Sequence, residues 1–342
     1  MIIIIGILFL FVVFGLKKAE NLDSCLEKEH TEAIKGIFII IVFYSHILPV
    51  LTRMGVSFSP VLDVPSNLLI KRIGQLMVVM FLFYSGYGVM ESIQRKGEGY
   101  IRSIPAKRIL STLINYNIAL FVFLVMNLII GIHYPVRQYL LSMIAWDSIG
   151  QSNWYIFAII CCYISTYLSF SLFKNKHAAF FATVVILLIY IIILWKIKET
   201  WWYDTILAYP AGMFVSLFKN NIFSIFKKYY TVCLVVITSL FVILYHFRSY
   251  NSIYIATSVS FAFLVFTVTF KYVISSTVLS WCGKNLFQLY IYQRIPMIAL
   301  PNLFPEYFKY HPYLYVVCCI GITVLLSFVI KPIPINLDNK KR

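Results

Sequence analysis

The sequence predicts an all-α fold, a polytopic transmembrane helix bundle of about 11 spans. Of the 342 residues, 61% are hydrophobic and only 12% are charged, about half the charged fraction of a soluble domain, and the mean hydropathy is +0.85. Apolar runs of membrane-spanning length recur along the whole chain. No hydrophilic segment is long enough for a soluble domain, so any activity belongs within or beside the bilayer.

The first predicted span, residues 1–16, precedes the core as an extra N-terminal helix. No cation comes before it, Lys17 and Lys18 follow it, and no small-residue cleavage site is evident, which is unlike a cleaved signal peptide. Residues 17–34 then form a charged cytoplasmic loop. Part of this loop is suited to an amphipathic helix on the membrane surface.

Residues 35–332 form the predicted membrane domain, and residues 333–342 form a basic cytoplasmic tail. The domain contains ten spans, at 35–51, 74–94, 109–131, 152–173, 178–195, 202–218, 230–247, 253–271, 283–301 and 312–332. The polar residues 174–177 separate the fourth span of the domain from the fifth.

The positions of Lys and Arg predict the orientation. Eighteen of them fall in segments on one side of the membrane and eight on the other. Cytoplasmic loops carry the excess of cations, so the first side, which includes the C-terminus, is cytoplasmic. This distribution also accounts for the net charge of +16, and we expect no nucleic-acid partner. The seven cysteines lack metal-ligand spacing, so we expect buried thiols and no metal site.

Lys35 and His46 form a polar pair in an otherwise apolar segment. Eleven residues make three helical turns plus about 20°, so both side chains share one face, roughly 16 Å apart along the axis. Lys35 then lies at the cytoplasmic surface and His46 in the outer half of the bilayer. Polar side chains on one face of a membrane helix are unfavourable in free energy unless that face lines a cavity. A helix-to-helix hydrogen bond would also explain His46, and a lysine at a helix end needs no ligand.

The next span, 74–94, adds small and polar side chains at overlapping depths. Ser85, Gly86 and Gly88 allow close helix approach, and packing alone is a sufficient reason for them. Three further side chains supply polar atoms: Tyr84, Tyr87 and Glu91. Glu91 lies near the cytoplasmic end, where it either pairs with Lys35 or reaches the interface.

Three other features are candidates for a binding role. The loop 95–108, with Lys107 and Arg108, is the most basic in the chain, which either topology or a phosphate-rich ligand explains. Trp154 opens a span, where it is equally an interfacial anchor. Gln288, Gln293 and Arg294 make the late span 283–301 too polar to face lipid, so it should line the interior.

Three separated segments together resemble the acyltransferase-three family of bacterial integral membrane O-acyltransferases. The first is the basic residue, ten residues and histidine from Lys35 to His46. The second runs from Phe81 to Tyr87 and is followed by Lys107-Arg108-Ile109, and the third runs from Gly283 to Ile291. The resemblance covers residues ~30 to 332 and includes the ten spans of the domain.

The resemblance implies transfer of an acyl group, usually acetyl, from acyl-coenzyme A to a hydroxyl of a cell-surface or lipid-linked sugar at the bacterial plasma membrane. Lys35, Lys107 and Arg108 would hold the phosphates of coenzyme A, and His46 would be the general base. The acceptor pocket would draw on six side chains: Tyr84, Ser85, Tyr87, Glu91, Trp154 and Gln293. No metal is implied.

The chain also departs from the family pattern. Lys35 replaces the usual arginine, and it supplies only a point charge. Gln293 stands where a histidine is common in the family. The paired arginines that are common before the span at 109–131 are reduced to Arg108.

A transporter or flippase of a lipid-linked sugar is the alternative from another functional class. It would explain many spans and a polar interior without acyl-coenzyme A, but the sequence contains no convincing internal repeat of the kind such proteins often have. A glycan polymerase would need a large charged outer loop, and the longest predicted here is about twenty residues.

Overall fold

The computed structural model describes residues 2–19, 22–57 and 63–334, and it confirms the all-α polytopic class. Most of the predicted tail, from residue 335 onward, lies outside the described residues. The two short strands, β1 (Leu16–Lys18) and β2 (Tyr272–Ile274), pair antiparallel with each other.

Within the described residues, eight helical segments are long and apolar enough to cross a membrane, and each overlaps a predicted span. They are α2 (Lys28–Arg53), α3–η2–α4 (Asp63–Ile73, Gly74–Val78, Val79–Lys96), α5–η3–α6 (Glu98–Ile104, Pro105–Leu110, Ser111–Ile129), α8 (Trp154–Leu172), α9 (Lys176–Ile197), α11 (Lys219–His246), α12 (Asn251–Lys271) and α17 (Pro312–Val329).

The other three predicted spans correspond to shorter helices. The first contains α1 (Ile2–Gly15), and the span at 202–218 contains α10 (Ala208–Leu217). The span at 283–301 is divided among three helices, namely α13 (Thr277–Lys284), α14 (Leu286–Tyr292) and α15 (Arg294–Leu303). The described residues also form η1 (Leu22–Leu26), α7 (Val136–Met143), η4 (Thr200–Trp202) and α16 (Pro305–Tyr310).

The prediction of one continuous helix over 283–301 is therefore wrong. At the first break, the Asn285 side chain donates to the carbonyl oxygen of Trp281 at 2.9 Å, a local bond that competes with helix continuation. Near the second break, Pro296 has no N–H to donate to the preceding turn.

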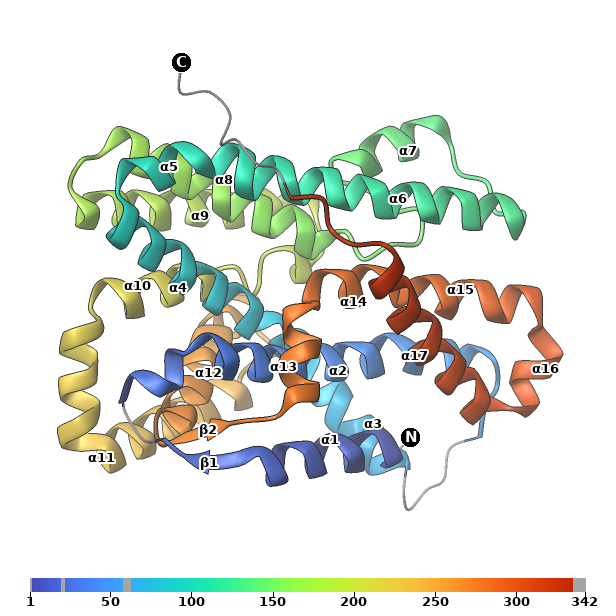
Figure 1. The fold of residues 1–342 in the computed structure, drawn as a ribbon, viewed down its shortest axis with the longest axis horizontal. Helices are drawn as coiled ribbons and strands as arrows, with labels where there is room; N and C mark the ends of the chain where they lie inside the picture. Colours follow the sequence, from blue (N-terminus) through green and yellow to red (C-terminus); the bar gives the residue numbers. More distant parts are fainter. Residues whose placement is uncertain (1, 20–21, 58–62, 335–342) are drawn as a thin grey trace.

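Helices α2, α6, α8 and α9 run along the long axis of the molecule, whereas α4 and α17 run obliquely to it (Figure 1). Helices α5 and α10 lie toward the left end in this view, and α7 and α16 lie at the right end. In the predicted orientation α5 belongs to a cytoplasmic loop, whereas α7 and α16 belong to outer loops. The picture therefore places loops predicted on opposite sides of the membrane at opposite ends of the molecule.

Two helix crossings depend on glycine. A Cβ added at Gly36 of α2 would lie 1.9 Å from the Leu279 carbonyl oxygen of α13, and one at Gly283 would lie 1.8 Å from the Glu32 carbonyl oxygen. Helices α4 and α10 cross in the same reciprocal way through Gly86 and Gly212. The expected close approach is thus confirmed at Gly86.

The same expectation is wrong at Gly88. A Cβ there would meet nothing within 4 Å, because this residue faces away from the crossing. Small residues in membrane helices mark close contacts only on the face that meets a neighbour.

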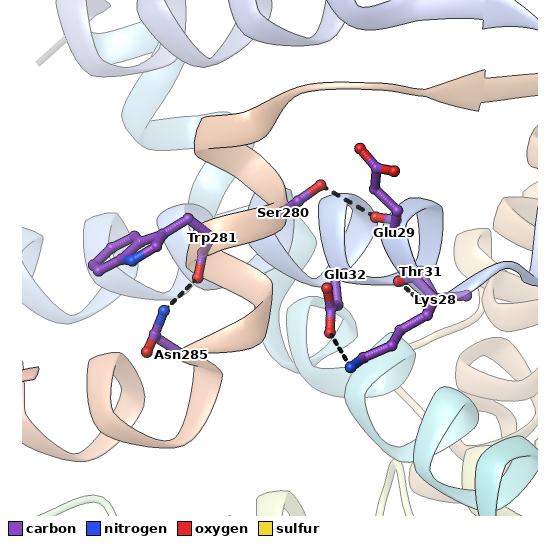
Figure 2. A network of polar contacts seen from close by, with 7 residues as sticks. All are labelled: Lys28, Glu29, Thr31, Glu32, Ser280, Trp281 and Asn285. Atoms are coloured by element: carbon purple, nitrogen blue, oxygen red, sulfur yellow. Dashed lines mark hydrogen bonds and ion pairs between the residues drawn. The ribbon is translucent and has the colours of Figure 1, made fainter. Parts of the chain in front are cut away.

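Polar contacts fix the start of α2 against α13 (Figure 2). The Ser280 hydroxyl of α13 donates to the Glu29 carbonyl oxygen of α2 at 3.2 Å, and within α2 itself Lys28 pairs with Glu32 at 3.8 Å. Nearby, the N–H of Ile274 in β2 donates to Nδ1 of His30 at 2.8 Å. These contacts set the position of the helix that carries Lys35 and His46.

Candidate functional site

His46 lines a cavity of about 560 Å³ near the end of α2 that is predicted to face outward. We call it the His46 cavity. Its walls come from α2, α3, η2, the start of α8 and α14, and they include Ser45, Arg53, Lys71, Gln75, Trp154 and Tyr290. Segments distant in the sequence therefore build one pocket around the imidazole.

A proline interrupts the backbone hydrogen bonding of α2 beside His46. Pro49 lies inside the helix and lines the cavity as well. Because proline has no N–H, it cannot donate to the carbonyl of Ser45 and it loosens the helix beside His46. The Ser45 hydroxyl instead donates to the Val42 carbonyl oxygen at 2.8 Å.

The imidazole of His46 is not held by a hydrogen bond to another part of the described chain. Its Nδ1 atom is buried without a hydrogen-bond partner among the described residues. Its ring lies 6.3 Å from the ring of Tyr290, measured between centroids. The helix-to-helix hydrogen bond that would have explained this histidine structurally is therefore absent from the described part of the chain.

A series of polar side chains leads from the His46 cavity toward the opposite end of the bundle. Tyr290 packs against Tyr155 of α8 with ring centroids 5.3 Å apart. Ser85 of α4 interacts with the hydroxyls of both Tyr155 and Tyr163. The Arg108 guanidinium then lies 6.0 Å from the centroid of the Tyr163 ring. These groups lie in sequence along the interior.

Lys35 and Arg108 come together at the predicted cytoplasmic end of this series. The charges of the two residues interact, and Glu32 is the acidic neighbour of Lys35. Arg108 lies in η3, a π-helical turn, and its Nε donates to the Tyr100 hydroxyl at 3.0 Å. Two half-buried cations from distant segments thus share one location, which is the kind of site that suits an anionic ligand.

Lys107 and Glu91 occupy different positions from these two cations. Lys107 is exposed, on the same turn as Arg108. Glu91 accepts a hydrogen bond from the Ser216 hydroxyl of α10 at 3.1 Å. The acidic group beside Lys35 is Glu32 rather than Glu91, so of the two roles considered for Glu91 the pairing with Lys35 is not the one formed.

The remaining predicted pocket residues lie in several places. Trp154 lines the His46 cavity, and Ser85 belongs to the polar series behind it. Tyr84 is buried near Thr269 of α12, and Tyr87 is half-buried on α4. Gln293 is fully buried and lines a second cavity of about 310 Å³, which is almost entirely apolar. A role for each of these residues remains a prediction.

Several lining residues were not identified from the sequence. Arg53 lies seven residues after His46, which is about two helical turns, so both side chains lie on one face of α2. Helical spacing could therefore have predicted that Arg53 lies near His46. Lys71, Gln75 and Tyr290 reach the cavity from other segments, and no spacing rule connects them to His46. Tyr290 does lie within the Gly283–Ile291 motif, although that motif alone does not indicate its neighbour.

Comparison with known proteins gives one match. The model of the acyltransferase-three family, described as an acyltransferase domain, matches residues 31–331. No curated protein and no solved structure matches the chain. The match includes all three of the sequence segments that carry the resemblance.

Proposed function

Because the chain belongs to the acyltransferase-three family, we propose that this multi-pass membrane acyltransferase is an O-acetyltransferase acting on a sugar. The donor is cytoplasmic acetyl-coenzyme A, and the acceptor is a hydroxyl of a cell-surface or lipid-linked glycan. The observation that carries this proposal is the arrangement along α2. Lys35 and Arg108 lie at one end, the His46 cavity lies toward the other, and a polar series connects them.

The cation pair is suited to the donor. Coenzyme A carries phosphates, and guanidinium and ammonium groups form charge-assisted hydrogen bonds with phosphate oxygens. With its phosphates at Lys35 and Arg108, its long pantetheine arm extends along Tyr163, Ser85 and Tyr155. The thioester is then delivered to the side of the cavity where Tyr290 meets His46.

His46 is suited to proton transfer. In the proposed reaction the imidazole takes the proton of the sugar hydroxyl, and the hydroxyl oxygen bonds to the thioester carbonyl carbon. The carbon–sulfur bond then breaks, and the leaving thiolate takes the proton back from the imidazolium. The products are the acylated sugar and free coenzyme A, and His46 is neutral again.

Direct transfer is the simpler course for this site. Among the described residues that line the cavity there is no cysteine. The two lining hydroxyls of α2, Ser45 and Thr52, donate to the carbonyl oxygens of Val42 and Leu48 at 2.8 and 3.0 Å. These bonds leave neither hydroxyl directed at His46 as a nucleophile.

The test is mass spectrometry of the surface glycans from cells with the gene, without it, and with a His46→Ala copy. We expect the gene to add the mass of an acetyl group to one glycan, and the deletion and the His46→Ala copy to lose it. The variant must accumulate in the membrane at the normal level. An unchanged glycan profile on deletion would favour the transporter or flippase alternative, and acetylation by the variant would remove His46 as the base.

A further inference from the structure

The His46 cavity has an electrostatic feature that proton transfer does not require. Two exposed cations, Arg53 of α2 and Lys71 of α3, line it. Arg294 of α15 is half-buried and does not line the cavity, but its charge interacts with Arg53, His46 and Tyr290. No aspartate or glutamate is among the lining residues that the structure describes. Two cations thus line the cavity, and a third from a separate segment acts on its histidine.

Topology does not explain this cluster. Cations are the minority on the side of the membrane to which Arg53 and Lys71 are assigned, where loops carry eight of them against eighteen on the other side. Arg294 belongs to a predicted span and enters neither count. Their concentration around one cavity needs another reason. In addition, the charge of the exposed Arg53 repels the half-buried Arg294, and an anion bound between them would relieve this repulsion.

The three cations lack acidic partners among the described residues. The ion pairs found there involve Lys28, Arg102 and Lys309, and none involves a residue of the cluster. Asp63 is the acidic residue of α3, the helix that carries Lys71, and it is buried and does not line the cavity. The positive charge at the cavity therefore remains available to a ligand.

We propose that the acceptor is an anionic glycan, whose phosphate or carboxylate group lies against Arg53, Lys71 and Arg294 while its reactive hydroxyl faces His46. This inference rests on the proposed function and names the class of acceptor. One guanidinium group can donate two parallel hydrogen bonds to two oxygens of the same phosphate or carboxylate group. Because the guanidinium is planar, these two bonds fix the orientation of the anion. The aromatic rings of Trp154 and Tyr290 and the amide of Gln75 supply apolar and polar contacts for a sugar ring.

The test measures binding of sugars to the full-length protein in lipid nanodiscs, without acyl-coenzyme A. The probes are an oligosaccharide with uronic acid, one with glycerol phosphate groups, and a neutral one of the same length. We expect at least one anionic probe to bind about tenfold or more tightly than the neutral probe, and the preference to weaken as salt is added. The two anionic probes distinguish carboxylate from phosphate as the recognised group.

Matched variants test whether the preference for anionic probes depends on the cations that line the His46 cavity. Arg53→Gln should weaken binding of the preferred anionic probe about tenfold and leave the neutral probe unchanged, and Arg53→Lys should restore part of the loss. Arg72→Gln is the control, since Arg72 is the exposed neighbour of Lys71 but does not line the cavity. It should change binding less than twofold.

Equal binding of neutral and anionic probes would overturn the proposal, as would an Arg53→Gln variant that loses affinity for acyl-coenzyme A instead of for the anionic sugar. A different result would contradict the proposed acyltransferase function. A protein that binds the anionic probe through Arg53 but transfers no acyl group to any glycan would keep the anionic site and lose the acyltransferase role.

Discussion

Lys35 and Arg108 are 73 positions apart in the chain, yet their charges interact at one end of the bundle. Lys35 stands on α2, the helix that also carries His46, and Arg108 stands on the π-helical turn η3. An extra residue in a helical turn shifts the side chains that follow it, and such turns are frequent at functional sites. Here the turn carries a guanidinium that contacts Tyr100 and Tyr163.

Replacing Arg108 tests the donor site. Arg108→Gln should raise the KM for acetyl-coenzyme A about tenfold or more, because a charge-assisted hydrogen bond to phosphate is lost. The measurement is steady-state kinetics in nanodiscs at varied acetyl-coenzyme A. Arg102→Gln is the matched control, since Arg102 is exposed and pairs with Glu98 at 2.9 Å. An exposed pair of this kind contributes little, so the control should retain the normal KM.

Replacing Lys35 tests whether a lysine can bind the donor phosphates at a position where the family usually has arginine. Lys35→Ala should raise the KM for acetyl-coenzyme A in the same direction as Arg108→Gln, and the double variant should show a non-additive effect because the two cations share one ligand. Lys96→Ala is the control, as Lys96 is exposed at the end of α4 and its charge is not among those that act on Lys35. Strictly additive effects of Lys35→Ala and Arg108→Gln would contradict a shared phosphate site.

His46 tests the chemical step. His46→Gln keeps a polar side chain of similar size but cannot take up the proton, so kcat should fall about 10²- to 10⁴-fold while the KM for acetyl-coenzyme A changes little. Single-turnover transfer to the glycan measures this step. If the variant instead keeps its kcat and loses affinity for the donor, His46 is a binding residue and not the base.

Gly283 tests the crossing that supports the site. Gly283→Ala would place a Cβ 1.8 Å from the Glu32 carbonyl oxygen, so α13 and α2 must separate, at a cost of about 1–3 kcal/mol for overpacking. The expected result is a lower melting temperature of the purified protein. Gly321→Ala in α17 is the control, because its Cβ would meet nothing within 4 Å. Equal melting temperatures for the two variants would contradict the close crossing.

The motif from Gly283 to Ile291 was predicted correctly in its location but not in its helical structure. Its polar residues correctly indicate an interior helix, and Tyr290 lies in the wall of the His46 cavity. Its division into α13, α14 and α15 was not predicted, because hydropathy averages over a window and does not register one side-chain bond at Asn285. In the structure Gln293 lines the apolar second cavity, while Tyr290 meets His46.

By itself, the sequence determined the helical membrane class, the positions of most spans and the axial separation of Lys35 from His46. These features follow from local rules, since bilayer thickness sets the length of an apolar run and helical periodicity sets which residues share a face. Only the tertiary structure decided which other helices face that side of α2. Arg108, Tyr155, Lys71 and Arg294 reach it through helix crossings and local breaks, and those depend on contacts between distant segments that no periodic pattern encodes.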